Sequence, residues 1–409
     1  MGQLGQRAWL AYYVGLGVLF AADAMLLAAV IWTAYRLGGS AVWISLGAVT
    51  LTGPVIVAGV GGAGVAARHV GRLSAFAWTG GLAALAIAVG VGVLGGSVWW
   101  LLAMALTAGL AQALRLPLGQ AQMMESASGE EIARRATFYE AASRGGVVAG
   151  PIIAGVLLAL GGPVAAFSAV AAAYLTGGVL WSLLATDRLP VPDQAEPYAL
   201  AHGIRLVQAD AWLLPALGVR AAGNLLWPAF TIALPLLVAL DWHGGAVGYG
   251  LARSVWGGGT VLATSLLVWL PVARERRQWA FFLCWVGTGV GFMLIGAAPG
   301  LLLGLLAVGF TALGSPLMHI AVDSHIAERV PRHWRGDLYA LQRLVVNGVQ
   351  TIGLLALVPV ANLLNPGRLL VLTGAAIVLV AVLGWRWMDG RRGPAWEGGV
   401  LARSGEEGR

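Results

Sequence analysis

Apolar stretches recur along almost the whole chain, and short segments rich in glycine, proline or arginine separate them. About twelve of these stretches approach or exceed the ~20 residues that an α-helix needs to cross a bilayer. Backbone groups in hydrocarbon must be paired within their own segment, so each stretch is predicted to be a transmembrane helix. The first stretch is too long for the apolar part of a signal peptide and is predicted to be the first span. The predicted spans are Trp9–Tyr35, Ala41–Ala66, Leu73–Leu94, Val98–Met124, Thr137–Leu160, Val164–Leu184, Trp212–Leu240, Ala246–Pro271, Trp279–Ala297, Leu301–Val322, Leu338–Leu363 and Arg368–Trp387.

The composition excludes a water-soluble globular protein. Hydrophobic residues make up 59% of the chain and charged residues 11%, and the mean hydropathy is +0.81. The formal charge of +7 comes from arginine alone, because the chain has no lysine. These arginines gather in short connections, where they indicate membrane orientation and not a nucleic-acid partner. The single cysteine, Cys284, excludes an internal disulfide.

Alternate connections between the predicted spans differ in charge. The basic set contains Arg68, Arg72, Arg134, Arg135, Arg188, Arg205, Arg274, Arg276, Arg277, Arg329, Arg332 and Arg335, and a basic tail starts at Arg391. The intervening connections carry few charges. Cytoplasmic loops are enriched in arginine, so the basic set is predicted to be cytoplasmic, together with both termini.

A polar, proline-containing connection, Asp187–Asp210, divides the predicted spans equally. Pro117 and Arg144 in the first half recur as Pro316 and Arg343, with the same separation within each pair, as a duplicated half would have. The sequence therefore predicts an all-α membrane protein with two pseudo-symmetric bundles of six helices each. The expected parts are an N-terminal bundle (1–186), a cytoplasmic linker (187–210), a C-terminal bundle (211–388) and a cytoplasmic tail (389–409).

One stretch, Tyr139–Gly155, combines regularly spaced small residues with a proline. Gly146, Gly150 and Ala154 recur every fourth residue, so on a helix they form one smooth face against which another helix can pack closely. Pro151 removes a backbone donor and is expected to bend the helix, and Gly155 follows the small face. From these residues alone, a tightly packed, kinked helix without a role in transport direction remains an alternative.

The ordered string from Gly146 to Gly155 resembles the antiporter motif on the fifth helix of exporters in the major facilitator superfamily. The string Val330–Gly336 and a degenerate loop motif at Gly64–Arg72 extend the likeness, which is nearest to the drug:proton antiporter branch of macrolide-efflux and enterobactin-exporter types. The resemblance implies two bundles that rock around a central cavity. It also implies a monomer in the bacterial cytoplasmic membrane, with protons and a small-molecule substrate as partners besides the lipid bilayer.

The loop motif departs from the family at its acidic position, where this chain has Arg68 between Gly64 and the pair Gly71 and Arg72. Asp337 stands where relatives commonly have arginine. One hypothesis is a charge-swapped cytoplasmic latch between Arg68 and Asp337. Two unpaired loop charges are an equal alternative, because an exposed pair contributes only ~0–1 kcal/mol. Arg144 and Arg343 occupy equivalent repeat positions, so they are also assigned to the cytoplasmic gate or its scaffold.

Ionisable side chains inside predicted spans are costly and are therefore candidate sites. Asp23 matches an acidic position common on the first helix of similar exporters, and a buried carboxylate could exchange a proton for substrate. Arg115 lies in a string that resembles a helix-four motif tied to proton handling, with Gln112 one turn before it as a candidate cavity residue. For both charged residues, a structural salt bridge or packing role is the alternative.

Two further sets lie on the second half. Arg220, Asn224 and Trp227 share one helix face and form a candidate substrate wall. His319 and Asp323 also share a face, and they are proton-relay candidates, while His325 points elsewhere. A metal site there is weakly indicated because no third ligand is set by spacing.

The chain contains no P-loop, no nucleophile-elbow string and no paired-cysteine motif, so neither an enzyme nor a cofactor is expected. The leading prediction is a secondary-active, proton-coupled exporter of small amphiphilic compounds. A narrow carrier of a siderophore or metal complex, a lipid or a nutrient is the alternative, and a membrane sensor that does not transport is the third reading.

Overall fold

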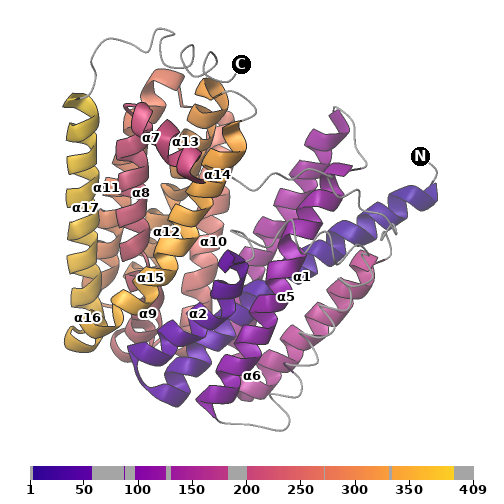
Figure 1. The fold of residues 1–409 in the computed structure, drawn as a ribbon. Helices are drawn as coiled ribbons and strands as arrows, with labels where there is room; N and C mark the ends of the chain where they lie inside the picture. Colours follow the sequence, from indigo (N-terminus) through magenta and orange to yellow (C-terminus); the bar gives the residue numbers. More distant parts are fainter. Residues whose placement is uncertain are drawn as a thin grey trace.

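The computed structural model describes residues 3–57, 87, 97–125, 130–182, 200–270, 272–330 and 334–390. Helices account for nearly all of these residues, and no β-strand occurs within these ranges (Figure 1). The predicted all-α membrane fold is therefore confirmed. Seven of the described helical stretches are long and apolar enough to cross a membrane, and two shorter apolar helices accompany them.

The N-terminal part of the chain provides α1 (Gln3–Gly38), α2 (Ala41–Val57), α5 (Val98–Glu125) and α6 (Glu130–Ser182). The long α6 is two helices joined at Gly162, whose backbone has φ 66° and ψ −164°. This positive φ suits glycine, which has no Cβ to clash. The turn predicted between the fifth and sixth spans is therefore present, and both of those spans lie in α6.

The C-terminal part begins with a short linker helix and continues through segments that pair up into longer spans. These elements are α7 (Leu200–Ala209), α8 (Leu213–Leu226), α9 (Pro228–Leu236), the π-helix η2 (Leu237–Asp241), α10 (Gly245–Trp269), α11 (Arg274–Ala297), α12 (Leu301–Leu313), α13 (Ser315–Arg329), α14 (Arg335–Arg343), the π-helix η4 (Leu344–Gly348), α15 (Val349–Ala356), α16 (Val358–Leu363) and α17 (Pro366–Gly390).

Three spans predicted as single helices, 212–240, 301–322 and 338–363, are interrupted in the structure. Pro228, Pro316 and Pro359 lie at the first or second position of α9, α13 and α16. A proline fits the start of a helix but breaks an existing one, since it lacks the N–H group and its ring meets the preceding turn. The span predicted to end at Val322 also continues through α13 to Arg329.

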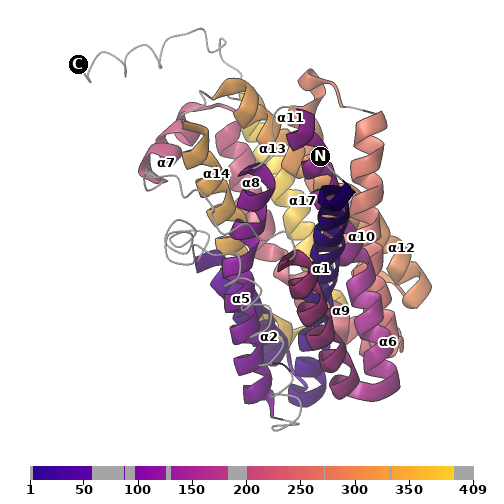
Figure 2. The same cartoon turned by 90° about the vertical axis from the view of Figure 1, so that its right-hand side faces the viewer.

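Close helix packing follows the small residues of α6. A Cβ atom added at Gly146 would meet the backbone of Ala21 on α1 at 2.5 Å, and one added at Gly155 would meet Ala246 on α10 at 2.6 Å. Ala154 is fully buried. The smooth face predicted for this stretch therefore brings backbones together, with α1 along one side of α6 and α10 along another (Figure 2).

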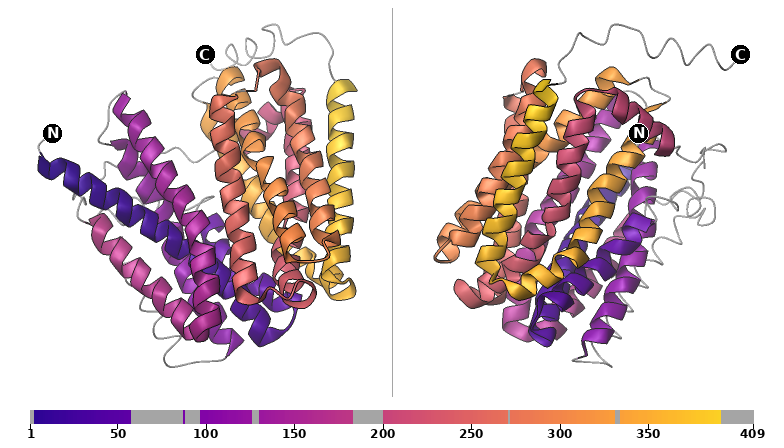
Figure 3. Two further views of the ribbon diagram at one scale, coloured as in Figure 1. Left: turned by 180° about the vertical axis from the view of Figure 1, so that it is seen from behind. Right: turned by 60° about the vertical axis from the view of Figure 1, so that its left-hand side comes forward.

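The N-terminal helices and the C-terminal helices form two groups that diverge toward one end of the molecule (Figure 3). The start of α1, the end of α17 and the linker helix α7 lie at this end, which we call the linker end. The groups contact one another through α6 with α10, α2 with α15, and α1 with α9 and α10. The predicted end of the first bundle at residue 186 lies outside the described residues, and the second half of the predicted linker forms α7, so the division into parts stays a prediction.

Candidate functional site

A pocket of about 210 Å³ lies between the two groups of helices, and we call it the inter-bundle pocket. Asp23 from α1 and Gln112 from α5 line it from one group, and Arg253 and Trp256 from α10 line it from the other. Pro151 of the small-residue stretch also contributes to its wall. The pocket thus joins two predicted site residues to the helix that carries the antiporter-like motif.

Asp23 is held by side chains from two other helices of its own group. Its Oδ1 atom accepts a hydrogen bond from the Tyr174 hydroxyl at 2.6 Å and from Gln112 Nε2 at 2.9 Å. The Gln112 amide also donates to the Tyr174 oxygen, at 3.2 Å. Two donors on one carboxylate oxygen hold the group in one orientation. The Asp23 carboxylate is therefore fixed at a defined place beside the inter-bundle pocket.

Arg253 on α10 lies at the same pocket as Asp23, on the opposite group of helices. The negative charge of Asp23 and the positive charge of Arg253 attract each other across the two groups of helices, and a protonated Asp23 would no longer exert this attraction. Trp256 lies one turn further along α10 and adds an apolar, aromatic wall to the pocket.

A second, more polar pocket of about 330 Å³ lies within the C-terminal group, and we call it the Arg220 pocket. Arg220 is only 2% exposed, and its Nη2 atom lies 2.5 Å from His319 Nδ1. A guanidinium can only donate, so Nδ1 must accept and the His319 ring is neutral with its proton on Nε2. His319 therefore belongs to a polar pocket, and it shares that pocket with Asp323, as the common helix face predicts.

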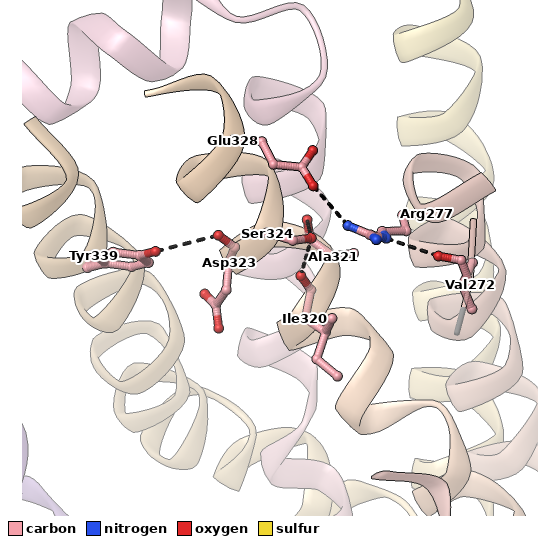
Figure 4. A network of polar contacts seen from close by, with 8 residues as sticks. All are labelled: Val272, Arg277, Ile320, Ala321, Asp323, Ser324, Glu328 and Tyr339. Carbon is pink, nitrogen blue, oxygen red and sulfur yellow. Dashed lines mark hydrogen bonds and ion pairs between the residues drawn. The ribbon is translucent and has the colours of Figure 1, made fainter. Parts of the chain in front are cut away.

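Asp323 accepts a hydrogen bond at Oδ1 from Gln342 Nε2 at 2.9 Å, and its backbone oxygen lies 3.5 Å from the Tyr339 hydroxyl. Figure 4 shows Asp323 and Tyr339 on the opposite side of α13 from the ion pair between Arg277 and Glu328, whose Nη1–Oε1 distance is 3.0 Å. Asp323 is therefore directed to the Arg220 pocket and away from that ion pair.

His325 points away from this pocket, as predicted, and pairs with Asp210 at the end of the linker helix. Its Nε2 atom lies 2.8 Å from Asp210 Oδ2. Asp210 Oδ1 also accepts hydrogen bonds from the backbone N–H groups of Trp212 and Leu213 at the start of α8. Burial raises the pKa of Asp210, but the hydrogen bond and charge of His325 and the two backbone donors outweigh burial and lower it overall.

The candidate substrate wall on α8 is only partly brought together. Arg220 lines a pocket, but the Asn224 Nδ2 group donates to the Arg220 carbonyl oxygen at 2.7 Å, within its own helix. Trp227 packs in an aromatic cluster, with ring centroids 4.9 Å from Trp256 and 5.4 Å from Phe292. Trp227 therefore supports Trp256 at the inter-bundle pocket from behind.

The gate residues are described only in part. Arg144 forms an ion pair with Glu140 at 2.6 Å, and its charge also acts on His319 across the two groups of helices. Gly64, Arg68, Gly71 and Arg72 lie outside the described residues, and so do the side chains of Arg115, Asp337 and Arg343. No cluster that could hold a metal ion occurs in the described part of the chain.

Sequence reasoning missed Tyr174, whose hydroxyl donates a hydrogen bond of 2.6 Å to Asp23. The sequence indicates this residue only as a tyrosine in an otherwise apolar span, and an aromatic residue in such a span usually contributes to packing between helices. Its role depends on the bend at Gly162, which returns the second half of α6 alongside α1.

Apolar helices in two groups that enclose charged pockets define an integral membrane transporter. The chain belongs to the Major Facilitator Superfamily, whose family model matches residues 12–354. It is a secondary-active transporter and not an enzyme. No curated protein sequence matches it.

Three solved structures illustrate the shared fold. The peptide transporter POT in complex with sulfate is 14% identical, with a TM-score of 0.75 and 96% of each chain covered. A POT family transporter in complex with 5-aminolevulinic acid is 12% identical, with a TM-score of 0.71, covering 96% of this chain and 98% of the other. A bacterial homolog to the human lysosomal transporter Spinster, in an inward-facing and unoccupied conformation, is 14% identical, with a TM-score of 0.68 and 95% and 98% covered. At these identities the likeness concerns the fold.

Proposed function

We propose that this transporter is a proton-coupled exporter of small amphiphilic compounds that works by alternating access in a bacterial cytoplasmic membrane. The observation that carries the proposal is Asp23, a carboxylate in a membrane span that faces the inter-bundle pocket and is held there by Gln112 and Tyr174. Ionisable groups in membrane spans are costly and mark ion pathways and proton relays. A carboxylate that only stabilised the N-terminal group could lie anywhere inside it, whereas Asp23 lies at the pocket between the two groups.

The coupling step follows from the position of Arg253 across the same pocket. When Asp23 is charged, it attracts Arg253 and favours approach of the two groups at this level. When Asp23 takes up a proton, that attraction is lost and the groups can separate to accept or release substrate. The proton thus changes the free-energy difference between two conformations, which is what coupling requires.

The small-residue stretch of α6 supports a mechanical link between these two charges. Gly146 and Gly150 pack against α1 on both sides of the turn that carries Asp23, while Gly155 packs against α10 before Arg253. Dense backbone contacts transmit small displacements because neither helix can deform locally. The likeness of this stretch to the antiporter motif favours export as the direction. With both termini in the cytoplasm, the linker end faces inward, so the divergence of the groups corresponds to an inward-open state.

The test is substrate-evoked proton flux in proteoliposomes, with wild type beside Asp23→Asn and a panel of lipophilic cations, macrolides and siderophores. Asparagine can still accept both hydrogen bonds at Oδ1, so the substitution removes the charge and the proton while keeping the local contacts. Asp241→Asn serves as the matched control, since Asp241 is an exposed carboxylate at the end of η2 and lines neither the inter-bundle pocket nor the Arg220 pocket.

Proton movement with at least one compound in wild type and in the control, and none in Asp23→Asn, is the expected result. Transport without proton movement in wild type would refute coupling, and transport by Asp23→Asn with intact coupling would remove Asp23 as the carrier. A narrow-specificity carrier is the second candidate function, and the polar character of the Arg220 pocket favours it. That reading gains if no compound of the amphiphilic panel moves.

A further inference from the structure

The Arg220 pocket contains an arginine that is buried but only partly satisfied. Arg220 is 2% exposed, and its Nη1 atom has no hydrogen-bond partner among the described residues. Its Nη2 atom is used by His319, which is uncharged in this arrangement and does not neutralise it. A buried guanidinium is costly unless it meets an acceptor, so Nη1 is a ready-made position for a negatively charged group.

The same pocket contains a carboxylate that does not serve as that acceptor. Asp323 lines the pocket, and the charges of Arg220 and Asp323 act on each other. Within the described part of the chain, however, the two residues form no ion pair, and the Oδ1 atom of Asp323 is taken by Gln342. The pocket therefore presents one positive and one negative charge, held apart by the helices that carry them.

This charge pattern determines which ligand fits. A ligand with only a negative charge would be attracted by Arg220 but repelled by Asp323. A ligand with only a positive charge would be attracted by Asp323 but repelled by Arg220. A zwitterion of the right length can place its carboxylate on Arg220 and its ammonium group on Asp323, and then the buried guanidinium and the carboxylate are both paired. The volume of about 330 Å³ lies at the small end of ligand pockets, and Tyr339 and Asn347 line it with further polar groups.

The pocket is also placed where cargo could reach it. Asn347 of η4 lines the pocket, and η4 contacts α2 of the N-terminal group, so the pocket lies next to the junction of the two groups of helices. Val346 adds an apolar side chain to the wall, against which the hydrocarbon part of an amphiphilic ligand can lie.

We propose that the Arg220 pocket binds a small zwitterion, an amino carboxylate whose carboxylate contacts Arg220 Nη1 and whose ammonium group contacts Asp323. The inference deepens the second candidate function, the narrow-specificity carrier, by naming its substrate class. It rests on the proposed function only for the claim that the bound zwitterion is transported, because binding itself needs neither a proton gradient nor a membrane.

The test is isothermal titration calorimetry on the full chain in detergent. The probes are 4-aminobutyrate, 5-aminopentanoate and 6-aminohexanoate, with pentanoate and pentylamine as matched compounds that carry one charge each. One of the amino carboxylates should bind at least about tenfold more tightly than either singly charged compound. Equal binding of pentanoate would make this an anion site, and equal binding of pentylamine would make it a cation site. Either result, or no binding by any probe, overturns the proposal.

Two substitutions test the assignment of the charges. Asp323→Asn keeps the acceptor for Gln342 but removes the negative charge, so pentanoate should bind it at least as well as the amino carboxylate does. Arg220→Gln should reverse the preference toward pentylamine, and its melting temperature shows whether it folds. Asp241→Asn, at an exposed residue that does not line this pocket, should keep the wild-type preference. An unchanged preference in Asp323→Asn refutes the assignment even if Arg220→Gln fails to fold.

These experiments distinguish a failure of the proposed zwitterion site from a failure of the proposed proton coupling. Loss of the zwitterion preference with intact proton flux would remove the pocket and leave the proton-coupled exporter. A clear zwitterion preference without proton flux in proteoliposomes would keep the pocket and remove the coupling mechanism assigned to Asp23.

Discussion

A single methyl group at Gly150 should separate two helices that carry the proposed mechanism. A Cβ atom built at this position would lie 2.5 Å from the Ala21 backbone oxygen, 2.8 Å from the Ala24 Cβ and 2.9 Å from the Met25 backbone nitrogen. Two of these three atoms are backbone atoms, which cannot rotate away as a flexible side chain can. The α1 and α6 helices must therefore move apart, and the contacts beside Asp23 loosen.

The expected magnitude comes from two opposing terms. Overpacking in a well-packed interior costs about 1–3 kcal/mol. Replacing a helical glycine by alanine also restricts the unfolded chain, which stabilises by ~0.4–1 kcal/mol where the site has room. Gly145 is the matched control, because a Cβ atom there meets nothing within 4 Å. Gly150→Ala should therefore lower stability, while Gly145→Ala should leave it unchanged or raise it.

The assay is thermal unfolding in detergent, followed with a thiol-reactive dye on Cys284, the only cysteine of the chain. Cys284 is partly buried, so its labelling should report the loss of native packing. A lower melting temperature for Gly150→Ala with an equal or higher one for Gly145→Ala is the expected result. Equal shifts in both variants, or a stabilised Gly150→Ala, would refute the close contact between α1 and α6.

Three further predictions concern other parts of the molecule. The Asp210 pKa is lowered in the folded state, so the charged Asp210 paired with His325 stabilises the folded protein at pH values above the unfolded pKa of ~3.9. This stabilisation is lost as the pH falls through the folded pKa, so the difference in melting temperature between wild type and Asp210→Asn should disappear in acid. Asp337→Arg should impair transport and added Arg68→Asp should restore it; a double variant no better than the single one ends the latch hypothesis. Gly223→Ala presses a methyl group against the Trp285 indole, so the melting temperature of this variant should fall by several degrees. An unchanged melting temperature would show that Gly223 and Trp285 do not pack closely.

Much of the fold could be predicted from the sequence because it depends on local properties. Hydropathy identifies helices that must satisfy their own backbone groups in lipid, and the break at Gly162 follows from a turn that needs a positive φ. The smooth face at Gly146 and Gly150 follows from helical spacing alone. The interruptions at Pro228, Pro316 and Pro359 were also readable in principle, since each proline begins a helix in the structure.

The grouping of charges was decided by tertiary structure. Asp23 and Tyr174 are 151 residues apart in the chain, and Asp210 and His325 are 115 apart, yet each pair is joined by a short hydrogen bond. Sequence patterns show which face of a helix a residue occupies, but they do not show which distant helix that face meets. In lipid the apolar surface is similar all around a helix, so close packing of small residues selects the neighbours. The sequence by itself determined that this protein is a bundle of membrane helices with costly charges inside its spans, whereas only the packing of those helices decided that Asp23 faces one pocket and that Arg220 and Asp323 share another.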